Sequence, residues 1–467
     1  MVMALATKQS DCATQAPPTR RARVFRLALP AVGEQVLNTF VGLADTFLIG
    51  HLSWQAAQQL GYTSTDALNG VGLANQVVGL ITVLFSAVGV GATAVIARSR
   101  GSKDMASANL ALRQSLLIGL GMGLLSTLLM LLLAPATMDM LGAAPEVRPL
   151  GVEFLQIAAL SFAPAAVLFL ATSALRGAGD TKTPLWIMLV VNAINILGSW
   201  LLINGNLGAP ALGVRGTAIG ASAARTVGAL ILLAILLRSG RGGMRLSFDL
   251  RPHVEMIKRI LRIGAPSGLE QLVFQGAILI FVRFVTGLGT VAYAAHNVVL
   301  NIESLSFLPG FGYAIAASAL VGYNLGAGSP ADAEADVYEA QIQGTLMMSA
   351  LGVVMMLFPH QLISLFTPDP AVADAGANAM RLAGLFQPLL AVNFIMSGGL
   401  RGAGDTRWPL ITKLISTWGV RLPLIMLMLH LGWGLTGVWI GMTFDFGVQA
   451  TLAWWQFQRG KWKHQRV

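Results

Sequence analysis

The stretch Leu-Arg-Gly-Ala-Gly-Asp-Thr occupies residues 175–181 and occurs again, unchanged, at residues 400–406. Each copy ends a long apolar run and precedes another, which begins at Pro184 after the first copy and at Pro409 after the second. An identity of seven residues at an offset of 225 in a 467-residue chain indicates an internal repeat. The chain is therefore interpreted as an internal duplication of one structural unit.

The sequence around the two copies repeats as well. Pro-x-x-x-Glu-Gln at residues 30–35 matches residues 266–271, and three glycines beginning at Gly213 match three with the same spacing beginning at Gly434. The repeat thus extends over both halves of the chain.

The composition predicts where the two halves reside. The chain is 55% hydrophobic and 11% charged, with a mean hydropathy of +0.68, whereas soluble proteins carry about 25% charged residues. The net charge of +10 raises the possibility of nucleic-acid binding, but the basic residues lie in short loops between apolar runs, where orientation in a bilayer explains them better. The expected partners are the lipid bilayer and small-molecule substrates, with no nucleic acid and no obligatory protein partner evident. The single Cys12 excludes a disulfide framework or a thiolate metal site.

Long apolar runs predict the fold, because about 20 apolar residues cross a bilayer and backbone groups in lipid must be paired within a helix. The predicted fold is all-α, a polytopic membrane protein with twelve transmembrane helices in two pseudo-symmetric six-helix lobes. The predicted spans lie near 24–50, 67–97, 107–134, 150–175, 185–205, 213–237, 256–287, 291–323, 338–360, 377–400, 409–430 and 435–457.

The distribution of lysine and arginine predicts orientation and domain limits. Basic residues gather in the two tails and in the loops after even-numbered spans, so both termini are expected in the cytoplasm, with the protein in the cell (inner or plasma) membrane. The expected domains are a tail (1–23), an N-terminal lobe (24–238), a linker (239–255), a C-terminal lobe (256–458) and a tail (459–467). Residues 53–66 form an extra outward loop of unexplained role in the first half.

The doubled motif has a structural interpretation of its own. Its glycines allow a tight turn at the membrane surface. Arg176 with Asp180, and Arg401 with Asp405, can pair with each other or with helix ends. We expect a rigid cytoplasmic hinge at these residues rather than a substrate contact.

These motifs, together with residues 30–50, 320–328 and 418–423, resemble the multidrug and toxin extrusion (MATE) family of bacterial transporters, over residues 25 to about 457. The resemblance is to the DinF-like members rather than to the branch with acidic residues in spans seven and ten, since span ten here has no carboxylate. It implies a V-shaped pair of lobes around a central cavity, exchanging cations inward for amphipathic, often cationic, compounds outward.

The resemblance also implies a coupling site in the first half. The family's helix-one aspartate, which helps to bind the coupling ion, corresponds to Asp45, and its partners from helices five and six fall on Asn195 and Thr217. Archaeal-type members have an aspartate where this chain has Ser199. The missing carboxylate makes a protonatable Asp45 the simpler coupling element, although a cage of Asp, Asn, Ser and Thr oxygens could still bind sodium, with Asp45 as metal ligand. No cofactor is expected beyond the coupling ion, H⁺ or Na⁺.

Charged residues inside spans provide further candidates, because each is costly in lipid. Glu34, Asn38 and Asp45 share one face of the first span. Glu34 is therefore a second coupling candidate, but its duplication as Glu270 also fits a structural role in satisfying backbone donors freed by Pro30 and Pro266. In the second half, Phe281 occupies the repeat position of Asp45, so no equivalent coupling site is expected there.

Two further sets of residues have predicted roles. Phe40, Phe47, Asn38 and Asn192 are candidates to line the substrate cavity. Arg283 and Arg421 are expected to pair with carboxylates or helix ends as structural ions.

The predicted function is secondary active antiport that exports amphipathic or cationic drugs or toxic organic compounds in exchange for protons or sodium. The alternative is a flippase or exporter of lipid-linked or other polar metabolites in the same superfamily. An enzyme is not expected, since the sequence has no paired-histidine metal motif, nucleophile elbow or phosphate loop.

Overall fold

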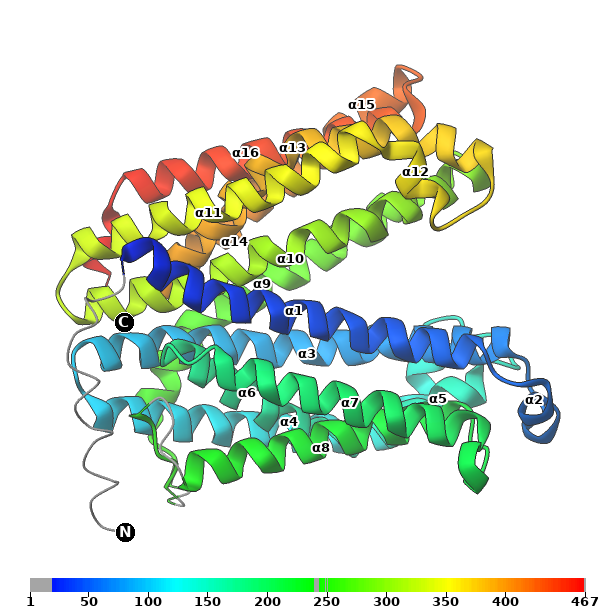
Figure 1. The fold of residues 1–467 in the computed structure, drawn as a ribbon, viewed down its shortest axis with the longest axis horizontal. Helices are drawn as coiled ribbons and strands as arrows, with labels where there is room; N and C mark the ends of the chain where they lie inside the picture. The colour runs from blue at the N-terminus through cyan, green and yellow to red at the C-terminus, as the bar shows by residue number, and fades with distance from the viewer. Residues whose placement is uncertain (1–18, 239–242, 248, 250, 466–467) are drawn as a thin grey trace, which may run out of the picture.

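The computed structural model describes residues 19–238, 243–247, 249 and 251–465, and all regular structure in those residues is helical (Figure 1). The first half contains α1 (Arg20–Gly50), α2 (Trp54–Leu60), α3 (Ser64–Gly101), α4 (Met105–Met140), α5 (Arg148–Ala159), α6 (Phe162–Gly177), α7 (Lys182–Asn204), the 3₁₀ helix η1 (Asn206–Gly208) and α8 (Val214–Arg238). The second half contains α9 (Val254–Thr286), α10 (Thr290–Gly326), α11 (Pro330–Leu357), α12 (Pro359–Ser364), α13 (Pro370–Gly402), α14 (Arg407–Lys413), the π-helical segment η3 (Leu414–Arg421), α15 (Leu422–His430), α16 (Gly434–Gln458) and the 3₁₀ helix η4 (Lys461–His464).

The number of spans agrees with the prediction. Among the described residues, ten helices are long and apolar enough to cross a bilayer, with α14 to α15 counted as one, and the bent pair of α5 and α6 makes an eleventh. The 25-residue α16 occupies the repeat position of α8 and completes six spans per half. The predicted all-α polytopic fold with two six-helix lobes is confirmed.

Two predicted spans are irregular, and a proline lies close to each irregularity. The span expected at 150–175 bends by 56° between α5 and α6, where Pro164 has no N–H to continue the helical hydrogen bonds. The span expected at 409–430 contains the π-helical segment η3, just before Pro423. Periodicity alone did not reveal either irregularity.

The two lobes converge at one end and diverge at the other (Figure 1). At the converging end, where the C-terminus lies, a Cβ built on Gly101 at the end of α3 would lie 1.9 Å from the Tyr323 carbonyl oxygen. A Cβ on Gly326 at the end of α10 would lie 2.0 Å from the Arg98 carbonyl oxygen. Only glycine permits this reciprocal backbone contact, which joins the repeats at equivalent positions.

Ion pairs between α1 and α11 strengthen the same end. Arg23 Nη2 donates to both oxygens of Asp336 at 2.6 and 2.8 Å, and Arg20 pairs with Asp332 at 2.8 Å. Asp336 is fully buried and also accepts a hydrogen bond from Asn324 at 2.7 Å. The first helix is thus tied to the second lobe at the converging end.

Helices extend into several segments that were expected to be tails or loops, where local contacts order the chain. Helix α1 begins at Arg20 rather than residue 24, because the Thr19 hydroxyl accepts a hydrogen bond from the Ala22 N–H. The expected tail after residue 458 includes η4, since Trp462 is buried and stacks on Phe457 with a centroid distance of 4.7 Å. The expected loop at 53–66 contains α2 and the first residues of α3.

The expected linker, 239–255, lies only partly within the described residues, and α9 already begins at Val254. Its described part lies against α4. Arg113 pairs with Asp249 at 2.7 Å, and the Gln114 side chain donates to the Arg251 carbonyl at 3.0 Å.

Candidate coupling site

Asp45 lies in the last third of α1, where it faces α7. Asn195 Nδ2 donates to Asp45 Oδ1 at 3.0 Å, and the Ser199 hydroxyl donates to the same oxygen at 3.1 Å. Both donors are buried, and they lie one turn apart on α7. Three of the predicted coupling residues are therefore in direct contact.

Unpaired oxygen atoms lie in this contact and one turn before it on α7. Asp45 Oδ2 has no hydrogen-bond partner among the described residues. Asn195 Oδ1 and Asn192 Oδ1 are buried without partners, and the Asn192 amide donates to the Met188 carbonyl. Because buried polar atoms are normally satisfied, unpaired oxygens beside a carboxylate form a local acceptor-rich site that a proton or a hard cation would satisfy.

Thr217 lies nearby but does not touch Asp45. Its hydroxyl donates to the carbonyl of Gly213, the residue just before α8, at 3.5 Å. One turn further along α8, a Cβ on Gly220 would lie 2.8 Å from the Ser199 hydroxyl, so α7 and α8 are in close contact here. Thr217 is buried and borders the site without bonding to it in this arrangement.

The predicted set omitted Arg225, although it is one of the few charged residues inside a span. This α8 arginine lies close enough to Asp45 to interact with it electrostatically. Its guanidinium has no hydrogen bond or ion pair within the described part of the chain. The site therefore combines one carboxylate, neutral donors and one nearby cation.

Glu34 lies apart from this site. It is buried three turns before Asp45, and its Oε1 is 3.7 Å from Arg176 Nη1. In the second lobe, Arg401 Nη2 donates to both oxygens of Glu270, at 2.7 and 3.0 Å. The repeated motif thus supplies one arginine per lobe to the repeated glutamate. Arginine, and not the backbone near Pro30 and Pro266, is the partner seen for both carboxylates.

The motif aspartates accept hydrogen bonds from residues at the starts of the following helices. Asp180 accepts hydrogen bonds from the N–H and the hydroxyl of Thr183, at 3.0 and 2.7 Å. Asp405 accepts from the Trp408 N–H at 3.4 Å and from Gln456 at 3.1 Å. The second glycine of each copy has a positive φ, +78° at Gly179 and +88° at Gly404, as a tight turn requires.

The candidate cavity residues of α1 lie on an exposed apolar face toward the diverging end. Phe40 and Phe47 are more than half exposed, and Phe47 packs on His51. Asn38 donates to Gln35 of its own helix at 3.4 Å, while Asn192 is buried. The structure does not gather these four residues into one pocket.

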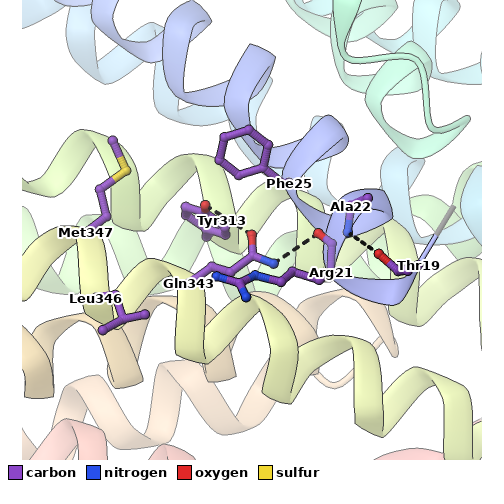
Figure 2. Close-up of a pocket in the computed structure, with 8 residues that line it drawn as sticks. All are labelled: Thr19, Arg21, Ala22, Phe25, Tyr313, Gln343, Leu346 and Met347. Carbon is purple, nitrogen blue, oxygen red and sulfur yellow. Dashed lines mark hydrogen bonds between the residues drawn. The ribbon is translucent and has the colours of Figure 1, made fainter.

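A groove of about 630 Å³ lies elsewhere, between α1, α10 and α11 (Figure 2). Gln343 joins its walls: it accepts a hydrogen bond from the Tyr313 hydroxyl at 3.3 Å and donates to the Arg21 carbonyl at 3.1 Å. None of the predicted cavity residues lines this groove.

In the described part of the second lobe, Phe281 stands at the repeat position of Asp45. Phe281 is buried against His296, with ring centroids 5.1 Å apart. Arg421 pairs with Asp445 as expected of a structural ion. Arg283 is exposed and has no carboxylate partner among the described residues.

Comparison with known proteins identifies the architecture. The MatE family model matches residues 30–201 and 266–427, one match in each half of the repeat. This chain belongs to the MatE family. The assignment agrees with the resemblance found in the repeated motif.

Relatives support the same family. A probable multidrug resistance protein NorM of Thermotoga maritima is 34% identical over 460 residues, covering 96% of this chain and 95% of the relative. An uncharacterized transporter YisQ of Bacillus subtilis is 28% identical, and the match covers 96% of this chain and 97% of that relative. A solved multidrug resistance MATE family transporter in an outward-facing conformation has a TM-score of 0.87 at 24% identity, covering 96% of this chain and 97% of that one. The chain is thus a multi-pass membrane protein of the multidrug efflux type.

Proposed function

We propose that this MatE protein is a secondary antiporter that exports amphipathic, often cationic, compounds in exchange for protons or sodium at Asp45. The observation that carries the proposal is the Asp45 carboxylate, held by Asn195 and Ser199 beside unpaired buried oxygens. A carboxylate inside a span is costly unless it has a partner or a function.

Asp45 can alternate between a charged and a neutral form. Asn195 and Ser199 fix its Oδ1 and leave Oδ2 available to a proton or a cation. With Ser199 in place of a second carboxylate, only one negative charge is present to hold sodium, which favours the proton. Competition between the coupling ion and a cationic substrate for one charge would produce exchange.

The charge distribution supports an orientation in the cell membrane. Basic residues of helix ends lie at the converging end, among them Arg98, Arg100, Arg176, Arg238 and Arg401, whereas Arg148 and Arg215 begin helices at the opposite end. By the positive-inside rule, the converging end and both termini face the cytoplasm. The structure would then correspond to an outward-facing state.

Transport in proteoliposomes tests the proposal, with proton and sodium gradients imposed separately and ethidium as the probe. A proton gradient is expected to drive ethidium movement in the wild-type protein and not in Asp45→Asn. Sodium-driven movement would identify sodium as the coupling ion. Wild-type rates in Asp45→Asn, or no movement under either gradient, would overturn the proposal.

A further inference from the structure

A buried charged cluster lies in the middle of the second lobe, away from Asp45. Arg421, the last residue of η3, donates from Nε to Asp445 Oδ2 of α16 at 2.7 Å, and its Nη2 is 2.6 Å from the same oxygen. The arginine is 4% exposed and the aspartate is fully buried. Asp445 Oδ1 is left without a partner.

Glu303 of α10 adds a second carboxyl group to this cluster. It is 1% exposed, and its Oε2 is buried without a hydrogen-bond partner. Arg421 lies close enough to act on Glu303 electrostatically. One guanidinium therefore interacts with two buried carboxyl groups and, among the described residues, is bonded to only one of them.

Among the described residues, the ammonium of Lys413 contacts groups other than Glu303. Its ammonium donates to Gln449 at 3.1 Å and lies 4.3 Å from the ring centroid of Phe274. The carboxylates that interact with it are Asp445 and Glu270. With Arg421 bonded to Asp445, an ionised Glu303 would be a buried charge without a hydrogen-bonded counterion, which is strongly unfavourable in a membrane interior.

Charged groups of the other helices that pack on α10 have partners of their own or lie at helix ends. On α1, Glu34 is near Arg176, and Asp45 bonds to α7. On α9, Glu270 pairs with Arg401, and Arg283 is exposed. Asp336 of α11 pairs with Arg23, and His360 of α12 pairs with Asp374. The charged residues of α3 are Asp66, Arg98 and Arg100 at its ends, and α13 contributes the neutral Gln387 and Asn393. His296 of α10 itself lies between Phe281 and Trp439.

The backbone before Arg421 allows a second arrangement. The segment η3 is π-helical over eight residues, and π-helical turns inside α-helices are frequent at functional sites. Ser416 and Thr417 in this segment are fully buried, with hydroxyls that have no partner. A change of register here would turn Arg421 relative to Asp445 and Glu303.

We propose that Glu303 is a proton-binding site of the C-terminal lobe, occupied while Arg421 is held by Asp445 and emptied when Arg421 turns toward Glu303. On release, the O–H bond of the carboxyl group breaks, the electron pair stays on the oxygen and the proton passes to water. The link to transport rests on the proposed function, whereas the proton site itself does not.

Infrared difference spectroscopy during a pH titration of the purified protein tests the site, because a protonated carboxyl group has its own C=O stretching band. The wild-type protein is compared with Glu303→Gln, with Glu303→Asp, which keeps a carboxyl group, and with Asp45→Asn, which controls for the other lobe. We expect a titrating band that is lost in Glu303→Gln, shifted in Glu303→Asp and retained in Asp45→Asn.

Identical titrations of wild-type protein and Glu303→Gln would overturn the inference, as would a Glu303 band that does not change with pH. If Glu303→Gln fails to fold, the comparison with Glu303→Asp decides: a shifted band supports the site and an unchanged spectrum overturns it. A positive titration in a protein that moves no ethidium would refute the proposed function and leave this site standing.

Discussion

The two lobes share a scaffold but differ at mid-membrane. Both have an arginine of the repeated motif beside a glutamate one turn after a proline, Glu34 with Arg176 and Glu270 with Arg401. At mid-span, the first lobe presents a half-buried Asp45 held by neutral donors, whereas the second has Phe281 at that position. The second lobe instead has a buried pair of Arg421 and Asp445 in its interior.

This difference shows how a duplicated unit can divide its tasks. The paired charges near the converging end hold the helices of each lobe in the same arrangement. The mid-span positions are free to diverge, because a single residue there decides whether a lobe presents an available carboxylate or an apolar core. We therefore expect equivalent substitutions in the two lobes to have different consequences.

The largest effect on stability is expected for Asp445→Asn. Removing one charge of a buried pair costs about 3–5 kcal/mol, of which pairing of Arg421 with Glu303 can recover only a part. Thermal unfolding of the detergent-solubilised protein should show a marked fall in Tm. The double variant Arg421→Leu, Asp445→Leu should recover part of the loss in stability. An unchanged Tm in Asp445→Asn would contradict a stabilising role of the buried pair.

Asp45→Asn should behave in the opposite way. The amide keeps an acceptor for Asn195 and Ser199, so the free energy of unfolding should change by less than about 1 kcal/mol. The rate of gradient-driven ethidium transport should fall by about tenfold or more, which corresponds to a rise of at least about 1.4 kcal/mol in the activation free energy of transport. Asp374→Asn, on the exposed start of α13, is the matched control and should transport normally.

Much of this contrast could be predicted from the sequence. The repeat, the number of spans and the contact of Asp45 with Asn195 and Ser199 follow from hydropathy and from the family resemblance. The partner of Glu34 could not be predicted. Arg176 lies 142 residues away (176 − 34), and either the backbone near Pro30 or an arginine would satisfy a carboxylate. Glu303, Arg421 and Asp445 stand out in the sequence as charged residues inside spans, but their grouping could not be predicted, since they come from α10, η3 and α16, which no sequence period connects.

Gly326→Ala tests the junction between the lobes. A Cβ there would lie 2.0 Å from a backbone oxygen of the other lobe, so the helix ends must separate, at about 1–3 kcal/mol for overpacking. A cysteine introduced at the buried Ser99, at the same end of α3, in a Cys12→Ser background should become more reactive to a soluble maleimide. Gly121→Ala, where a Cβ meets nothing within 4 Å, is the control and should leave that reactivity unchanged.

The smallest effect is expected from neutralising the two equivalent glutamates. Glu270 accepts two hydrogen bonds from Arg401, the shorter 2.7 Å, whereas Glu34 lies 3.7 Å from Arg176, beyond hydrogen-bond distance. A charge-assisted hydrogen bond contributes about 1.5–3 kcal/mol, so Glu270→Gln should lower the free energy of unfolding by about 1 kcal/mol more than Glu34→Gln. Thermal unfolding of both variants measures the difference, and both should retain most ethidium transport because both glutamates lie apart from Asp45 and pair with motif arginines. Complete loss of transport in a stable Glu34→Gln protein would contradict a shared structural role and make Glu34 a second proton carrier beside Asp45.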